Sequence, residues 1–234
     1  ITTGIFGGSF NPIHNGHVEL ARLLLASAGL DEIWFVVSPQ NPFKRAADLL
    51  DDDLRLKMVE LALEGEPRMH ASDYEFRMPR PSYMWHTLQS MSRDYPDRRF
   101  VLLIGADNWE RFSEWYAWRD ILSHYRIVIY PRGGSAVDAA SLPEGVSLVD
   151  TRLIDISSTQ VRQFIAAGRP INGLVPDSVA RYISDNGLYA PKFKSVDNIS
   201  ELFFRNSDIV LIALLIVKTQ HEIGKNSGQK YFSF

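Results

Sequence analysis

The stretch that decides the fold runs from residue 7 to residue 17 and reads Gly7-Gly8-Ser9-Phe10-Asn11-Pro12-Ile13-His14-Asn15-Gly16-His17. The apolar run Thr2–Phe6 before it predicts a short buried strand, and the apolar stripe of Asn15–Ala28 after it predicts a helix. Glycines directly after a strand let backbone N–H groups approach an anion, and a helix N-terminus adds partial positive charge. The stretch therefore predicts a phosphate-binding loop between a strand and a helix.

The two histidines of this stretch, His14 and His17, are three residues apart and lie on one side of the first turn of the predicted helix. Both can donate hydrogen bonds to phosphate oxygens. Taken alone, however, a His-x-x-His pair is also compatible with a metal pair or with two surface histidines. The stretch is not a P-loop, since no Gly-Lys-Ser/Thr follows, and it is not the dinucleotide glycine fingerprint.

Predicted strands and helices alternate through residue 190. The strands are expected at Thr2–Phe6, Ile33–Val37, Arg68–Phe76, Phe100–Ile104, Arg126–Tyr130 and Val146–Val149. The helices are expected at Asn15–Ala28, Asp51–Leu63, Ser82–Met91 with Ser82 as N-cap, two short ones within Trp109–Leu122, Ser158–Ala167 and Pro176–Asp185.

This alternation implies parallel β-α-β crossovers and therefore an α/β fold, a doubly wound and mostly parallel sheet of Rossmann-like form. Ligands of such sheets bind outside the carboxyl ends of the strands. The polar segments that follow predicted strands are Gly7–His17, Ser38–Lys44, Gly105–Asn108 and Pro131–Gly134. We expect these segments to meet at one edge of the sheet and to form the site there.

Composition excludes several classes of protein. Of the 234 residues, 45% are hydrophobic and 23% are charged, which is ordinary for a globular protein that buries a core. The net charge of −3 argues against a nucleic-acid partner, whose footprint would be basic. The longest apolar run, Ile209–Val217, has nine residues, against about 20 in a membrane-spanning helix, so no membrane partner is expected. A chain without cysteine suits the cytoplasm.

The full stretch at residues 7–17 resembles the His-x-Gly-His signature of the nucleotidyltransferase α/β-phosphodiesterase superfamily. Within that superfamily the chain looks most like the bacterial nicotinate-nucleotide adenylyltransferases. Further segments resemble motifs of this family in the expected order: Ser38–Lys44, Pro81–Leu88, Gly105–Asn108, Trp115-Tyr116 and Ile156–Arg162. The resemblance covers residues 2 to about 190 and implies a nucleotidyltransferase fold for this part of the chain.

The resemblance also implies a reaction, in which the 5′-phosphate of nicotinate mononucleotide attacks the α-phosphorus of ATP and expels pyrophosphate, with Mg²⁺ bound through the triphosphate. The residues implied to carry catalysis are His14, His17, Lys44 and Arg162. Those implied to bind ATP are Gly7, Gly8, Ser9, Phe10, Gly105, Asp107, Ile156, Ser157, Ser158 and Thr159. Those implied to bind nicotinate mononucleotide are Asn41, Tyr83, Met84 and Trp115. No metal-ligating residue of the protein is implied.

Simpler interpretations of these residues stay open at this point. Lys44 can be a solvated loop lysine and Asp107 a turn aspartate. Ser158 and Thr159 are expected to cap a helix in either case, with Arg162 one turn later. The remaining aromatic residues of this region are expected in the core, namely Trp109, Phe112 and Trp118.

The chain departs from the family pattern at the start of one predicted helix. Met84 stands where the family has Thr, and Trp85-His86 replace a small or aliphatic residue and an acid. We therefore expect the nicotinate carboxylate to be recognised by backbone N–H groups of Ser82–Trp85. The alternatives are a nicotinamide mononucleotide or pantetheine-phosphate adenylyltransferase, and a non-catalytic nucleotide-binding module.

The last 44 residues differ from the rest in composition. Residues 1–190 contain 17 Arg and 2 Lys, whereas residues 191–234 contain 5 Lys and 1 Arg. This shift predicts an atypical C-terminal tail over 191–234, and the resemblance implies a nucleotidyltransferase domain over 1–190. The tail is either an additional helix around Ile209–Thr219 or a segment appended by read-through or fusion. The sequence does not define the oligomeric state.

Overall fold

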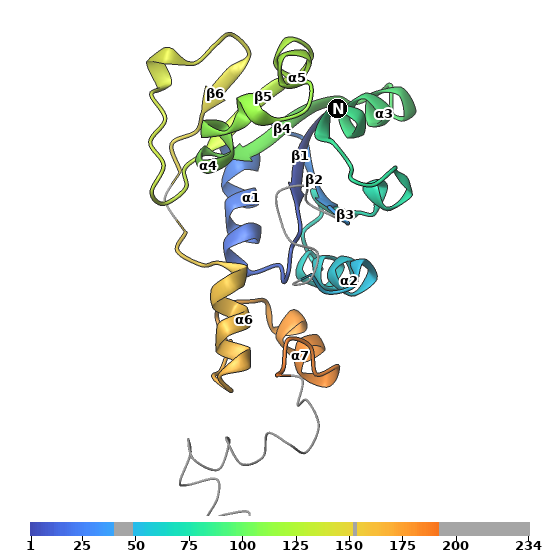
Figure 1. Cartoon of the computed structure of the whole chain (residues 1–234), viewed down its shortest axis with the longest axis vertical. Helices are drawn as coiled ribbons and strands as arrows, with labels where there is room; N and C mark the ends of the chain where they lie inside the picture. Colours follow the sequence, from blue (N-terminus) through green and yellow to red (C-terminus); the bar gives the residue numbers. More distant parts are fainter. Residues whose placement is uncertain (40–48, 152–153, 192–234) are drawn as a thin grey trace, which may run out of the picture. The chain divides into compact units, whose positions relative to one another are not determined.

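A computed structural model describes residues 1–39, 49–151 and 154–191 (Figure 1). Its centre is a parallel sheet in the order β3-β2-β1-β4-β5-β6. The strands are β1 (Thr2–Gly8), β2 (Glu32–Val37), β3 (Met69–Ser72), β4 (Arg99–Gly105), β5 (Arg126–Tyr130) and β6 (Val146–Leu148). This is the doubly wound strand order of Rossmann folds, and it confirms the predicted fold class.

Helices cover both faces of the sheet. The first core packs against α1 (Asn15–Ser27), α2 (Asp52–Ala62), α6 (Ser158–Ala166) and α7 (Asp177–Asp185). The second core packs against α3 (Met84–Asp94), α4 (Ala106–Glu110) and α5 (Trp118–His124). Short 3₁₀ turns complete the connections at η2 (Tyr74–Arg77), η3 (Phe112–Glu114) and η4 (Ala139–Ser141).

The central strands carry continuous apolar runs because both faces of their middle parts are buried. Ile5 of β1 is in register with Leu102 of β4, and both contribute to the second core. The next pair along, Phe6 and Leu103, points the other way into the first core. A continuous apolar run with side chains alternating between two cores is what a sheet covered on both faces requires.

Two predicted elements differ from the structure. The stretch Arg68–Phe76 was expected as one strand, but only Met69–Ser72 is extended, and a 3₁₀ turn follows at η2. Ser82 is not the N-cap of α3, because its hydroxyl donates a 2.8 Å hydrogen bond to Glu75 and the helix begins two residues later. A tertiary hydrogen bond thus takes the group that the local pattern assigned to capping.

A third difference concerns α6. The capping residue is Ser157, whose hydroxyl accepts a 3.1 Å hydrogen bond from the backbone N–H of Gln160. Ser158 and Thr159, which were expected to cap, are the first two residues of the helix itself. The shift leaves the Ser158 hydroxyl available for a contact with the loop of residues 7–17.

The predicted boundary at residue 190 stays a prediction, because the tail from residue 192 onward lies outside the described residues. Among the helices that the structure describes, none combines the length and the apolar character needed to cross a membrane.

Candidate active site

Two adjoining cavities open at the carboxyl ends of β1, β4 and β5. The larger, of about 1050 Å³, is lined by the loop of residues 7–17, the residues after β4 and β5, and the start of α6. The smaller, of about 500 Å³, lies beside the start of α3 and the residues around Trp115. The residues lining both are Gly7, Gly8, Asn108 and Tyr130. The polar segments expected to meet at this edge therefore do so, apart from residues 40–48, which lie outside the described chain.

The two histidines form a stacked pair in the larger cavity. His14 immediately precedes α1, and its ring centroid lies 3.7 Å from that of His17, with 25° between the ring planes. The backbone N–H of His14 donates to Nδ1 of His17 at 3.2 Å. An imidazole that accepts at Nδ1 carries the proton of its neutral form on Nε2. His17 is thereby oriented as an N–H donor.

His14 is only 3% exposed, and its electrostatic environment disfavours the protonated ring. Burial, followed by the charge of Arg132, lowers the pKa of His14 from 6.5 to about 3. The ring is therefore neutral near pH 7, and a neutral imidazole can donate a hydrogen bond through a single N–H only.

Gly16 permits the close packing of this pair. A Cβ placed on Gly16 would lie 3.0 Å from Nδ1 of His14 and 3.1 Å from a methyl carbon of Ile154. Contacts this short require the neighbouring groups to move. The glycine of the His-x-Gly-His motif is thus explained by the space that the His14 ring occupies.

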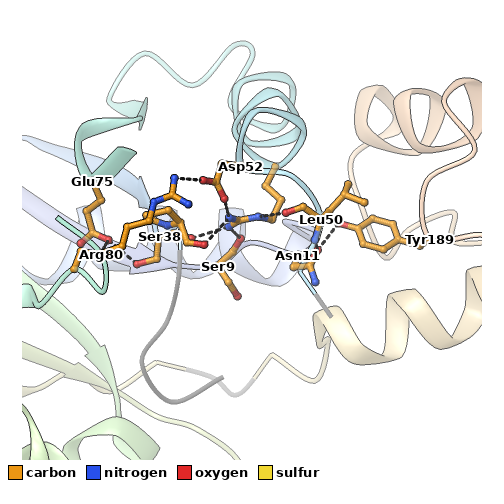
Figure 2. Close-up of polar contacts among 11 residues, drawn as sticks. Ser9, Asn11, Ser38, Leu50, Asp52, Glu75, Arg80 and Tyr189 are labelled. Carbon is orange, nitrogen blue, oxygen red and sulfur yellow. Dashed lines mark hydrogen bonds and ion pairs between the residues drawn. The ribbon is translucent and has the colours of Figure 1, made fainter. Parts of the chain in front are cut away.

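A fully buried arginine fixes the loop before the histidines. Arg55 of α2 donates to the backbone carbonyls of Ser9 at 2.5 Å, Ser38 at 2.8 Å and Leu50 at 2.9 Å, and it pairs with Asp52 (Figure 2). The backbone at Ser9, Ser38 and Leu50 is therefore joined by one guanidinium group. This arrangement holds the loop backbone in place next to the larger cavity.

Hydrogen bonds from Tyr189 and from helix α6 also hold the loop of residues 7–17. Asn11 accepts a 2.8 Å hydrogen bond at its side-chain oxygen from the hydroxyl of Tyr189, near the end of the described chain (Figure 2). Its backbone carbonyl accepts from Arg162 at 2.7 Å, and the carbonyl of Pro12 accepts from Ser158 at 2.8 Å. Helix α6 is thereby docked on the loop with its N-terminal residues lining the larger cavity.

Arg132, to which sequence reasoning assigned no role, also lines the larger cavity. It follows β5 and lies 3.9 Å from a carboxylate oxygen of Asp107. A Cβ on Gly105 would meet both of these side chains, at 2.4 Å for Asp107 and 2.8 Å for Arg132. The absence of a side chain at Gly105 therefore allows the side chains of Asp107 and Arg132 to approach each other. The segment Pro131–Gly134 had been expected at this edge, but its arginine was not singled out.

The smaller cavity combines aromatic and acidic side chains. Tyr83, Trp115 and Tyr116 line it together with Met84, whose terminal methyl would lie 3.0 Å from a Cβ on Gly7. Helix α3 begins at this cavity, and no side chain caps it. Glu75 also lines the cavity, although its position in a predicted exposed strand gave no sign of this.

Most of the predicted site residues meet in these two cavities. The larger is lined by His14, His17, Arg162, Gly7, Gly8, Ser9, Phe10, Asp107, Ile156, Ser157, Ser158 and Thr159. The smaller is lined by Tyr83, Met84 and Trp115. Gly105 lines neither, and Asn41 and Lys44 lie outside the described residues. The expected core positions of Trp109, Phe112 and Trp118 agree with their packing in the second core.

A Rossmann-type sheet with a histidine-bearing anion loop at its carboxyl edge defines a nucleotide-binding protein of the nucleotidyltransferase class. In agreement, the model of the family described as "Cytidylyltransferase-like" matches residues 5–164. A Bacteroides fragilis protein named "Probable nicotinate-nucleotide adenylyltransferase" is 49% identical over 181 residues, which are 77% of this chain and 90% of the relative. A protein of the same name from Bacteroides thetaiotaomicron is 49% identical over 79% of this chain and 92% of its own length. The chain belongs to the nicotinate-nucleotide adenylyltransferase family.

Solved structures agree on the fold. The nicotinic acid mononucleotide adenylyltransferase of Plasmodium falciparum, complexed with NaAD, superposes with a TM-score of 0.68 at 20% identity. The superposition covers 80% of this chain and 97% of that one. At this identity the likeness supports the fold, and the function must be argued from the site.

Proposed function

We propose that the protein transfers the adenylyl group of ATP to nicotinate mononucleotide, giving nicotinate adenine dinucleotide and pyrophosphate, a reaction of NAD biosynthesis. The observation that carries this proposal is the pair of adjoining cavities that share Gly7, Gly8, Asn108 and Tyr130. A dinucleotide product needs two neighbouring compartments with a phosphate-binding junction between them. The names of the relatives and the NaAD complex of the Plasmodium falciparum enzyme support the same reaction.

The larger cavity suits ATP. The N-terminus of α6 carries partial positive charge, and Arg132 and Arg162 add guanidinium groups to the lining. These groups would hold the triphosphate, with His14 and His17 at the α-phosphate. Lys44 stays part of the proposal as a further phosphate-binding residue.

The smaller cavity suits the pyridine ring. Trp115 would stack on the ring, and Tyr83 lies at the same cavity. The N–H groups in the first turn of α3 receive no side-chain cap and would donate to the nicotinate carboxylate. Recognition by backbone donors does not depend on the hydroxyl that Met84 lacks.

The chemistry needs neither a protein nucleophile nor proton abstraction. An oxygen of the 5′-phosphate attacks the α-phosphorus of ATP and forms a new P–O bond. The bond from that phosphorus to the bridging oxygen breaks, and its electron pair leaves with pyrophosphate. His14 and His17 would donate N–H groups to the oxygens on which charge gathers, and positioning with such donors is the main source of catalysis in phosphoryl-type transfer.

Mg²⁺ fits this site as a companion of ATP. Asp107 and Asp155 are the carboxylates that line the larger cavity among the residues that the structure describes. Mg²⁺ is commonly held by one or two carboxylates together with substrate phosphates and water. When bound, the ion would supply neutralisation of charge on the triphosphate.

A chain without cysteine is also suited to the cytoplasm, where we place the reaction.

Nicotinamide mononucleotide is the second candidate acceptor, because Met84 offers an apolar side chain to the smaller cavity. The test is pyrophosphate release from ATP and Mg²⁺ with nicotinate mononucleotide, nicotinamide mononucleotide and phosphopantetheine compared side by side. We expect the highest kcat/KM with nicotinate mononucleotide. A preference for either other acceptor would reassign the activity, and ATP binding without release of pyrophosphate would indicate a binding module.

A further inference from the structure

The charged residues that line the smaller cavity are both acidic. They are Glu75 and Glu114, and no Lys, Arg or His occurs among the described residues of its lining. An acidic lining is unexpected for a cavity that binds a nucleotide, because the phosphate of a nucleotide carries negative charge. The excess of acidic over basic side chains indicates that a positively charged part of the ligand binds in this cavity.

The two carboxylates are in different situations. Glu114 is half exposed and forms an ion pair with Arg111 at 2.6 Å. Glu75 is only 2% exposed, and it accepts hydrogen bonds from the hydroxyls of Ser38 at 2.7 Å, Ser82 at 2.8 Å and Thr87 at 2.9 Å. Solvent and a guanidinium screen the charge of Glu114, whereas the partners of Glu75 are hydroxyl groups.

Three hydroxyl donors suit an ionised carboxylate, which can only accept hydrogen bonds. They do not cancel its charge, and in the described part of the chain no basic side chain forms an ion pair with Glu75. Buried carboxylates are rare in proteins unless they are paired, because desolvation of the charge is costly. The negative potential of Glu75 therefore extends into the cavity beside it, where a cation would be stabilised.

Aromatic side chains also line the smaller cavity. Tyr83 and Tyr116 lie with ring centroids 5.0 Å apart and are 37% and 52% exposed, respectively. Trp115 lines the same cavity. Aromatic faces attract cations, and clusters of them bind quaternary nitrogen. The acid and the aromatic rings thus favour the same kind of ligand.

We propose that Glu75 and the rings of Tyr83, Trp115 and Tyr116 form a cation-selective binding site for a ribosylated pyridinium ring. In this site Glu75 determines the specificity for the positive charge of the pyridinium ring. The ring nitrogen of a pyridine mononucleotide is quaternary and carries that charge. Reduction to the dihydropyridine removes it while the ribose and the phosphate stay the same. The enzyme therefore discriminates against mononucleotides whose ring is reduced. This inference rests on the proposed function.

The experiment measures dissociation constants, by calorimetry, for nicotinamide mononucleotide and its reduced form, which differ in ring charge. We expect the wild-type protein to bind the charged form at least about tenfold more tightly, and Glu75→Gln to reduce that ratio by about fivefold or more. Glu75→Asp, which keeps the charge, should retain most of the preference. A poorly folded fraction lowers the apparent number of binding sites and leaves both dissociation constants, and so their ratio, unchanged.

The matched control is Glu32→Gln, which removes a largely buried, hydrogen-bonded carboxylate at the opposite end of the sheet. It should leave the ratio unchanged. An unchanged ratio in Glu75→Gln, together with normal adenylyl transfer, would overturn the role of Glu75 and leave the proposed function standing. Failure of the wild-type protein to bind any pyridine mononucleotide, nicotinate mononucleotide included, would overturn both.

Discussion

Gly16 lies between the two histidines at a point where a side chain would press on the His14 ring. Gly16→Ala should lower kcat about tenfold or more, because displacements well under 1 Å at reacting groups are costly. The free energy of unfolding should change by no more than about 1 kcal/mol, since alanine is the better helix former. Steady-state kinetics and thermal unfolding measure the two effects separately. An unchanged kcat would show that the His14 ring position is not critical.

In the proposed reaction, His17 would donate a hydrogen bond to the transferring phosphate. His17→Ala should reduce turnover about 10²-fold to 10³-fold, as loss of one donor to a developing charge does elsewhere. ATP should still bind, because the groups of α6 and Arg132 are untouched. Turnover assays with isothermal titration of ATP test this. A variant with normal turnover would contradict the role assigned to His17.

His14 should make the protein sensitive to acid. Its pKa is about 3 in the folded protein, against an ordinary value of about 6.5 when the chain is unfolded. Between these values the unfolded state binds more protons, so the free energy of unfolding falls as pH decreases, by at most about 1.4 kcal/mol per pH unit. Urea unfolding at pH 7, 6 and 5 measures the slope. His14→Asn, which cannot be protonated in this range, should show a smaller slope, and an equal slope would assign the effect to other groups.

At the scale of elements, the N-terminus of α6 depends on its cap. Ser157→Ala removes the acceptor for the Gln160 N–H and should cost about 1 kcal/mol of stability. The KM for ATP should also rise, because this helix start lines the larger cavity. Ser157→Thr keeps the hydroxyl and serves as the control. Equal stability and KM in the alanine and threonine variants would mean that the cap is dispensable.

The sequence predicts most elements well, because their patterns are local. The strand Arg126–Tyr130 was expected with the bounds it has, and the helix of Asn15–Ala28 ends one residue earlier than expected. The capping role of Ser82 was predicted wrongly and the burial of Glu75 was not predicted, for a shared reason. Each is fixed by a partner from another element, and the burial of Glu75 depends on hydroxyls from three separate places in the chain. No periodicity over neighbouring residues carries that information.

The candidate site was predictable to the extent that it lies in motifs. The stretches 7–17 and 156–162 were found because they resemble motifs of a known family, and most of their residues line one cavity. Arg132 was missed because an arginine after a strand is ordinary in sequence. Its importance comes from the distance to Asp107 and from its effect on the pKa of His14. Such long-range electrostatic effects appear only once the chain is folded.

At the scale of the whole molecule, Arg55 joins segments that are distant in sequence. Arg55→Leu would leave four backbone carbonyls, those of Ser9, Ser38, Pro39 and Leu50, without their donor and should destabilise the protein by about 3 kcal/mol or more. The control is Arg22→Leu, whose side chain pairs with Glu66 at the surface and should cost at most about 1 kcal/mol. Denaturant unfolding of both variants tests this. Similar losses would show that the buried position of Arg55 is unimportant.

The hydrogen bond from Tyr189 to Asn11 joins the last described turn to the first loop of the chain. It sets a lower limit on how far the protein can be shortened. A chain cut just before Tyr189 would keep every strand and every cavity-lining residue that the structure describes, yet one support of the histidine loop would be gone. Truncated or fused forms of this protein should therefore retain Tyr189, because its hydroxyl supports the histidine loop.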